Sequence, residues 1–98
     1  MRANLLVIYT TRPGECRDFY SSLGMDFRLE RHGDGPEHFA AVLPDGTVFE
    51  IYPALRGRTT GALRLGFATL AAAGLPPGRH LTRDPDDRVV EIHVRPAP

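Results

Sequence analysis

The chain has 98 residues, the size of a single domain, and its one cysteine, Cys16, excludes an internal disulfide. Twelve basic residues, all of them arginine, balance twelve acidic ones, so no charge excess favours nucleic acid or an anionic membrane as a partner. No apolar run is long enough to span a bilayer, and the first residues lack the features of a signal peptide. We therefore expect a cytoplasmic protein.

The first half of the chain predicts a strand, a helix and then three strands. Asn4 to Thr10 is a largely apolar run, which indicates a strand buried on both faces. Thr11-Arg12-Pro13 marks a helix start, and apolar residues recur with helical spacing from Cys16 to Leu23. Gly24 follows the last of them and ends the helix. Because Cys16 lies on the apolar stripe, we expect an inert, buried thiol.

The next three strands follow the helix closely. Phe27 to His32 alternates apolar and charged residues, as a half-exposed strand does, and the loop Gly33-Asp34-Gly35-Pro36 comes after it. His38 to Leu43 is the next strand, and the turn Pro44-Asp45-Gly46 joins it to the strand of Glu50. We expect His32 and His38 to face solvent, with His38 also able to reach the rim of a cavity.

The second half of the chain predicts a shorter set of elements. After a loop from Pro53 to Gly61, Leu63 to Thr69 is typical of a strand. Leu70 to Gly74 allows one helical turn at most, since Pro76 and Pro77 follow. The last two predicted strands, His80 to Arg83 and Arg88 to Val94, form a hairpin.

One stretch of the sequence occurs twice. The segment Pro44–Tyr52 returns 41 residues later as Pro85–His93, with Pro, Asp, Val, Glu and Ile in register. Each copy predicts a turn followed by a strand with a single carboxylate in its middle, Glu50 or Glu91. Side chains alternate across a strand, so each carboxylate lies opposite the most apolar face. Both carboxylates are therefore expected to point into a second space enclosed by the sheet.

The order of elements, the segment Asp18–Met25 and the two Pro-Asp-x-x-Val-x-Glu-Ile strands resemble the vicinal oxygen chelate superfamily. This superfamily includes glyoxalase I, bleomycin and fosfomycin resistance proteins and extradiol dioxygenases. The resemblance runs from about Leu5 to Val94 and implies an α+β fold, in which paired βαβββ modules form a curved mixed sheet around a cavity. One domain over residues 1–98 would then contain a first module at about 4–53 and a second at about 62–95.

The resemblance also implies where metal ligands would stand, on the first and last strand of each module. The last-strand positions are Glu50 and Glu91, which match the superfamily, whereas the first-strand positions fall at Leu5 and Arg64. Neither is the His or Gln of the metalloenzymes, and an arginine cannot deprotonate to bind a metal. We therefore expect no metal and no other cofactor, with Arg64 holding the two carboxylates in the metal's place.

The second module is predicted to be shortened. Leu5 to Glu50 spans 45 positions but Arg64 to Glu91 only 27, so 18 residues are missing, about a helix and most of a strand. The missing helix would have covered the apolar strand face of Val90, Ile92 and Val94. We expect a second copy of the chain to cover that face in a homodimer.

These observations leave three functional hypotheses open. The first is a metal-free protein that binds an unidentified small molecule, as bleomycin resistance proteins do. The second is a divalent-metal-dependent lyase, isomerase or dioxygenase with Glu50 and Glu91 as ligands. The third is an assembly module without a ligand, in which the shortened second module has closed the cavity. Separately, Glu50 and Glu91 have solvated carboxylates on an open sheet face as their alternative. No serine, histidine and aspartate spacing indicates a catalytic nucleophile. The candidate residues of the cavity are Glu50, Glu91, Arg64, Tyr9, Tyr52 and His93, and His93 has a surface position as its alternative.

Overall fold

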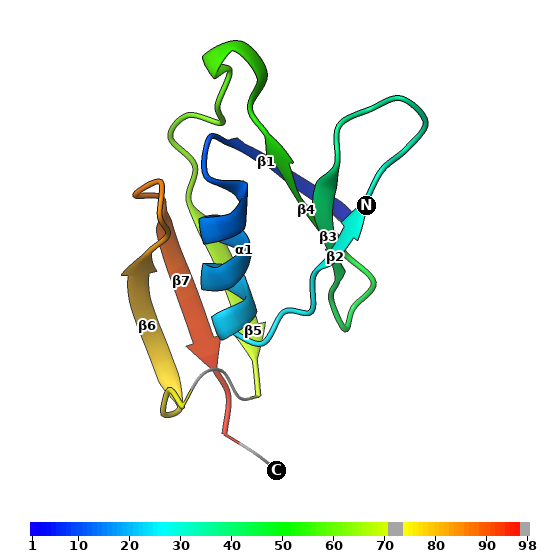
Figure 1. Cartoon of the computed structure of the whole chain (residues 1–98). Coiled ribbons are helices and arrows are strands. Elements are labelled where there is room, and N and C mark those ends of the chain that lie inside the picture. The colour runs from blue at the N-terminus through cyan, green and yellow to red at the C-terminus, as the bar shows by residue number, and fades with distance from the viewer. Residues whose placement is uncertain (71–73, 97–98) are drawn as a thin grey trace.

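The computed structural model describes residues 1–70 and 74–96, which form one α-helix and seven strands in two sheets (Figure 1). This confirms the α+β class. The elements are β1 (Leu5–Thr10), α1 (Pro13–Ser22), β2 (Arg28–Glu30), β3 (His38–Val42), β4 (Val48–Pro53), β5 (Leu65–Thr69), β6 (Gly78–Arg83) and β7 (Val89–Val94), with a short 3-10 helix, η1 (Leu55–Gly57), in the connection between the sheets.

The second sheet repeats the first with one strand fewer. The strand order is β1-β4-β3-β2 in the first sheet and β5-β7-β6 in the second. The parallel pair β1·β4 corresponds to the parallel pair β5·β7, and the antiparallel pair β3·β4 corresponds to β6·β7. Within the described residues the second sheet has no counterpart of β2 or of α1. The prediction of a shortened second module is therefore confirmed.

The repeated turns have the same backbone structure. In the segments Leu43–Thr47 and Asp84–Arg88, the first residue's N–H donates to the carbonyl of the last, at 2.8 and 3.0 Å. The positive φ that each turn requires falls on Gly46 (φ 90°) and on Asp87 (φ 66°). Both residue types tolerate this left-handed backbone region better than most, which explains the turn residues of the repeat.

Helix α1 begins and ends where the sequence predicts. Pro13 occupies the first turn, where its missing N–H costs no hydrogen bond. Gly24 follows the helix with φ 103°, and its N–H donates to the Ser21 carbonyl at 3.0 Å. Cys16 is buried as expected, and burial raises the pKa of its thiol to about 11, so the reactive thiolate is disfavoured at neutral pH.

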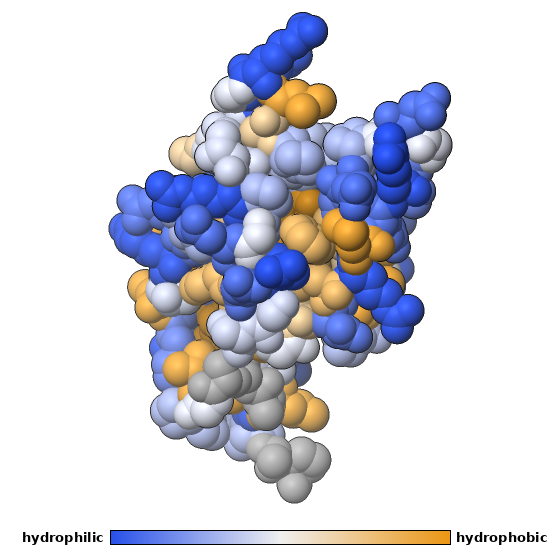
Figure 2. All heavy atoms as spheres, in the orientation of Figure 1, coloured by the Kyte–Doolittle hydropathy of each residue, from blue (hydrophilic) through white to orange (hydrophobic). Residues whose placement is uncertain are grey.

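Both sheets and α1 share a single core. In Figure 1 the helix lies between the two sheets. On the face shown in Figure 2, hydrophobic residues gather in the middle of the molecule and hydrophilic residues lie on either side. The ring of Tyr20 on α1 packs edge-on against Phe49 at 4.9 Å between centroids and against Phe67 at 6.2 Å. The buried residues of this hydrophobic core are Ile8, Cys16, Tyr20, Phe49, Ile51, Leu65, Val90, Ile92 and Val94.

The expectation that a second copy must cover Val90, Ile92 and Val94 is wrong. All three side chains are buried by the chain itself, in the same cluster as the helix residues. The length comparison of the modules missed this because it assigned one helix to each sheet, whereas α1 packs between both. The homodimer remains a prediction, but the reason given for it is removed.

The first strand is also exposed more than predicted. Ile8 and Thr10 are buried, but Leu5 and Tyr9 are exposed. The strand is an edge of its sheet, and only its inner face meets the core. An apolar run therefore indicated the strand correctly but not the burial of its outer face.

A buried charged network ties α1 to the turn between β6 and β7. The Tyr20 hydroxyl donates to Asp84 Oδ2 at 2.7 Å, and Arg88 Nη1 donates to the same oxygen at 3.0 Å. The side chains of Asp84 and Arg88 are 0% and 3% exposed, and Arg88 also pairs with Asp86 at 2.9 Å. Buried charges persist only when they are paired, so this network fixes how the second sheet docks on the helix.

The described residues include no helix that is both long and apolar enough to cross a membrane. The helical turn predicted from Leu70 to Gly74 lies largely outside the described residues. The other predicted elements are present, and their bounds differ from the predicted ones by no more than two residues. The short helix η1 was not predicted, because it lies within the segment Pro53 to Gly61 that was expected to be a loop.

Removal of the buried carboxylate should destabilise the fold strongly. In Asp84→Ala the Arg88 guanidinium and the Tyr20 hydroxyl lose their shared acceptor, and we expect the free energy of unfolding to fall by about 3 kcal/mol or more. The matched control is Asp26→Ala, at an exposed aspartate, which should change it by less than about 0.5 kcal/mol. Urea denaturation measures both, and equal effects would contradict the role of the network.

Candidate metal centre on the first sheet

The outer face of the first sheet, turned away from α1, carries the polar residues of interest. Along β4, Phe49 and Ile51 are buried in the core, and Glu50 lies on the opposite face. The strand register places Ala40 directly beside Glu50, and His38 directly beside Glu30 of β2. The small Ala40 side chain leaves room above the sheet, so long side chains from β2, β3 and β4 can converge there.

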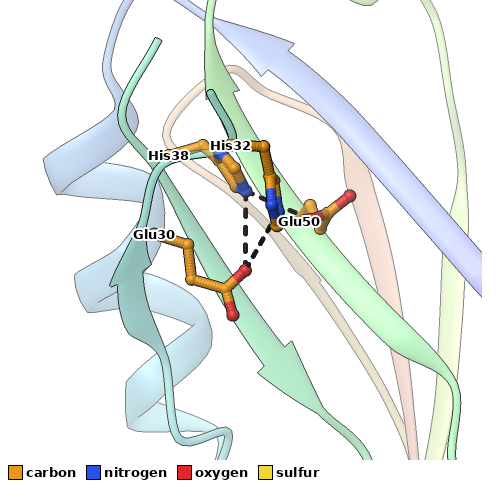
Figure 3. A group of neighbouring side chains, drawn as sticks. All are labelled: Glu30, His32, His38 and Glu50. Atoms are coloured by element: carbon orange, nitrogen blue, oxygen red, sulfur yellow. Dashed lines mark ion pairs between the residues drawn. The ribbon is translucent and has the colours of Figure 1, made fainter. Parts of the chain in front are cut away.

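Four side chains meet on this face, as Figure 3 shows: Glu30, His32, His38 and Glu50. One donor atom from each lies within 4.8 Å of all the others. The Nε2 atom of His38 is 3.2 Å from Glu50 Oε2 and 3.7 Å from Glu30 Oε2. The Nε2 atom of His32 is 3.4 Å from the same Glu30 oxygen.

The His38 ring is held in a fixed orientation. Its Nδ1 lies 3.2 Å from the Pro36 carbonyl oxygen, an acceptor that keeps the proton on Nδ1. One face of the ring stacks on Tyr52, with 4.0 Å between centroids and 8° between planes. These two contacts direct Nε2, with its lone pair, toward the carboxylates of Glu30 and Glu50.

This arrangement requires a positive charge. The His38 side chain is 1% exposed, and its Nε2 has no hydrogen-bond partner within the described residues, because the nearby Glu50 oxygen is not aligned for one. A lone pair facing two carboxylates in a buried position is repulsive unless a proton or a metal ion lies between them. Burial and the charge of Glu50 raise the pKa of the adjacent Tyr52 phenol, which reflects the same negative potential.

The spacing of the donor atoms matches a tetrahedral metal ion. Bonds of about 2.0 to 2.1 Å to imidazole nitrogen and carboxylate oxygen place tetrahedral ligands roughly 3.3 Å apart. Three of the donor distances in the cluster are 3.2, 3.4 and 3.7 Å, and the others are no longer than 4.8 Å. Two imidazoles with two carboxylates form a donor set suited to Zn²⁺ and similar ions, whereas Mg²⁺ and Ca²⁺ prefer oxygen alone.

The sequence analysis found only part of this cluster. His32 is exposed as expected, but the expectation that His38 faces solvent is wrong, because Tyr52 and the loop before β3 cover its ring. In the sequence, Glu30 is typical of a charged residue on a half-exposed strand and does not stand out as a ligand. The sequence does contain a signal for this cluster. Glu30 and His32 are two positions apart and so share one strand face, and a short loop connects them to the strand that begins at His38.

The other repeated carboxylate, Glu91, lies in a different cluster. On the outer face of the second sheet, Arg64 Nη2 donates to Glu91 Oε1 at 2.7 Å, and Arg79 donates to the same oxygen. His93 Nε2 lies 3.3 Å from Oε2 of the same side chain. The predicted pairing of Arg64 is therefore confirmed for Glu91. Among the described ion pairs, Arg64 has none with Glu50.

The single cavity predicted to contain both carboxylates is not seen within the described residues. Glu50 belongs to the histidine cluster and Glu91 to the arginine cluster, on the outer faces of separate sheets. Tyr9 and Tyr52 do lie together beside Glu50, with 5.6 Å between ring centroids. They form part of an open sheet face, with Tyr9 itself exposed, and not the wall of an enclosed pocket.

Comparison with known proteins relies on the structure, because no protein-family model and no curated protein matches the chain. A protein from the mobile metagenome of V. pseudocholerae has a similar structure, with a TM-score of 0.64 and 16% sequence identity over 94% of this chain and 92% of that chain. A possible glyoxalase from Bacillus cereus has a TM-score of 0.63 and 12% sequence identity, over 95% of this chain and 98% of that chain. Oxidase ChaP-H2 has a TM-score of 0.63 and 14% sequence identity, over 98% of this chain and 94% of that chain.

These neighbours, together with the two related sheets, decide the fold. The chain has the vicinal oxygen chelate fold. The identities are too low to carry an activity across. In this fold the resemblance placed metal ligands at Leu5, Glu50, Arg64 and Glu91, and the structure does not fit a metal there. Leu5 offers no donor atom, and Arg64 is paired with Glu91. Only Glu50 of this set belongs to the four-residue cluster.

The arginine cluster predicts a pH dependence. Hydrogen bonds from Arg64, then from Arg79 and His93, lower the pKa of Glu91 from 4.5 to about 2. A carboxyl group whose pKa is lower in the folded state than in the unfolded state stabilises the fold at pH values above the unfolded pKa. For Glu91 this stabilisation is lost as the pH falls from about 4.5 to about 2.

We expect Glu91→Gln to lose stability relative to the parent at neutral pH and to lose less of it near pH 2. Urea denaturation across this pH range measures the difference. Glu37→Gln, at an exposed loop carboxylate, is the control and should show a difference that barely changes with pH. A difference for Glu91→Gln that is equally constant would contradict the assigned pairing.

Proposed function

We propose that the chain is a divalent-metal-binding protein of the vicinal oxygen chelate fold, with the metal held by Glu30, His32, His38 and Glu50. One observation carries the proposal. The buried Nε2 of His38 faces two carboxylates without a hydrogen-bond partner, at the distances that a tetrahedral ion requires.

The ligand set favours binding over catalysis. Catalytic zinc sites usually keep one coordination position open for water or substrate, whereas four protein ligands complete a tetrahedral shell. A metal here would also join the short strand β2 to β3 and β4, since its ligands come from all three strands and the adjoining loop. A bound ion of the Zn²⁺ type would therefore act on structure and would stabilise the first sheet.

This proposal replaces the ligand pair suggested by sequence. The metal-dependent alternative used Glu50 with Glu91, while the expectation of a metal-free protein rested on Leu5 and Arg64. Glu30, His32 and His38 belong to neither of these ligand sets. Metal content decides between the readings.

A second candidate function is the binding of a small organic molecule against the outer face of the first sheet. The observation that favours it is the exposed apolar surface beside the cluster, formed by Leu5, Tyr9 and the half-buried Val7 and Tyr52. Aromatic surface of this kind is common where proteins bind small molecules. This function does not depend on a metal.

Metal binding is tested by titrating the metal-free protein with Zn²⁺, and with Co²⁺ for its visible absorption. We expect one ion per chain, and a Glu50→Gln affinity lower by about 100-fold or more, since even supporting residues of metal sites commonly change affinity 10- to 100-fold. His32→Ala, at an exposed position, gives a second ligand variant that should fold normally.

The matched control is Glu91→Gln, which changes the corresponding carboxylate of the second sheet. Its affinity for the metal should equal that of the parent. Absence of saturable binding, or binding that Glu50→Gln leaves unchanged, would contradict the proposal. Equal loss in Glu50→Gln and Glu91→Gln would instead favour the ligand pair suggested by sequence.

A further inference from the structure

A second feature, separate from the metal centre, is a groove of about 870 Å³ where the two modules meet. Three segments line it: Thr11 and Arg12 before α1, the connection from Thr59 to Arg64, and the segment from Pro85 to Val89, with Arg83 at the end of β6. The volume lies within the range of about 300 to 1,000 Å³ that is typical of small-molecule sites. Neither the four cluster residues nor Glu91 lines this groove.

The groove is locally basic although the chain as a whole is neutral. Its lining includes Arg12, Arg64, Arg83 and Arg88 but only two carboxylates, Asp86 and Asp87. Asp86 is already paired with the buried Arg88 at 2.9 Å. The charge excess therefore lies with the other three arginines, which come from three different segments of the chain and face the same space.

The guanidinium groups of these three arginines remain available to a ligand. Their side chains are 54% (Arg12), 58% (Arg64) and 59% (Arg83) exposed. Arg12 Nη1 lies 3.7 Å from an exposed Glu15 oxygen and donates to the Pro85 carbonyl at 3.3 Å. Arg83 Nη1 lies 3.6 Å from an exposed Asp87 oxygen and donates to the Asp87 carbonyl at 3.1 Å. In the described contacts, Nε and Nη2 of both side chains have no other partner. Long, exposed pairs of this kind contribute little, so an anion can displace them at small cost.

Two further features hold the donors in place. Arg64 is anchored by its 2.7 Å ion pair with Glu91, which leaves its Nε and Nη1 without another partner among the described contacts. At the base of the groove, the Arg88 side chain is 3% exposed and its Nε has no hydrogen-bond partner. The charge of Arg88 is already balanced by Asp84 and Asp86, so this residue supports the groove and is not one of the donors offered to a ligand.

The start of α1 adds to this potential. Arg12 precedes the helix and provides no side-chain cap, so the first-turn N–H groups lack the usual acceptor. The helix macrodipole places partial positive charge at the same end, where the carboxylate of Glu15 in the first turn offsets part of it. This contribution is secondary to the arginines but has the same sign.

We infer that this groove binds a small oxyanion, the phosphoryl or carboxylate group of a small molecule, through Arg12, Arg64 and Arg83. Planar guanidinium groups suit both chemistries, since each can donate two parallel hydrogen bonds to an oxyanion. The inference is independent of the proposed metal function, because the two sites share no residue.

The test is an NMR titration of the 15N-labelled full chain, treated with EDTA, against inorganic phosphate and separately against benzoate, at constant ionic strength. We expect saturable shifts of the amides of the Thr59–Arg64 segment with at least one of the two anions. Saturation with phosphate alone identifies a phosphoryl site, and saturation with benzoate alone identifies a carboxylate site; both results support the inference. Shifts that stay linear with both anions would overturn it.

The variants locate the binding. The double change Arg64→Gln and Arg83→Gln should weaken it by about ten-fold or more, the loss expected for charge-assisted hydrogen bonds. If the double variant at Arg64 and Arg83 does not fold, the double variant Arg12→Gln and Arg83→Gln replaces it, because it leaves the ion pairs of Glu91 intact. The control, Arg28→Gln with Arg31→Gln, removes the same charge from the first sheet and should change affinity less than two-fold. If the control variant weakens anion binding equally, the binding depends only on the total charge of the chain, and the inference is overturned. Glu50→Gln, which disables the proposed metal centre, should bind the anion normally.

Discussion

A single helix, α1, packs between two sheets and contributes to one core shared by both. Two β-sheets with apolar inner faces need to be covered, and the chain provides only α1 to do so in its described part. Tyr20 meets this need from a single position, because its ring contacts Phe49 and Phe67 from different sheets and its hydroxyl donates to Asp84. The second sheet can therefore dispense with a helix of its own.

This packing also determines where chemistry can occur. Since the inner faces are used for the core, Glu50 and Glu91 must lie on the outer faces of their sheets. Equivalent carboxylates then have different neighbours. Glu50 faces imidazoles and a further carboxylate, an arrangement that needs a cation, whereas Glu91 is already neutralised by two guanidinium groups. The shortened module thus has the same strand and carboxylate as the first, but the opposite charge around that carboxylate.

Much of the fold could be predicted because its signals are local. Helical spacing with Pro13 and Gly24 predicts α1, and the repeated turn and strand predict β4 and β7. The length difference between the modules predicts the missing elements. The burial of Val90 could not be predicted in this way, because it depends on the packing of a helix far away in the sequence.

The site was harder to predict than the fold for the same reason. Strand alternation places Glu50 on an outer face, but the distance between Glu50 and His38 depends on strand register, which the sequence alone leaves open. His38 was misjudged because a histidine next to a polar loop is commonly exposed, and only the stacked Tyr52 ring and the Pro36 carbonyl make it buried and oriented. The ligand positions implied by the superfamily resemblance fall at Leu5 and Arg64, outside this cluster.

Metal binding by His38 and its three neighbours can be tested by diffraction. The most direct measurement is a crystal structure of the zinc-soaked protein, with anomalous diffraction collected at the zinc absorption edge. The account predicts an anomalous peak at roughly 2.0 to 2.1 Å from His38 Nε2, bonded also to Glu30, His32 and Glu50. A map without a peak at this cluster, or with its main peak beside Glu91 and His93, would contradict it.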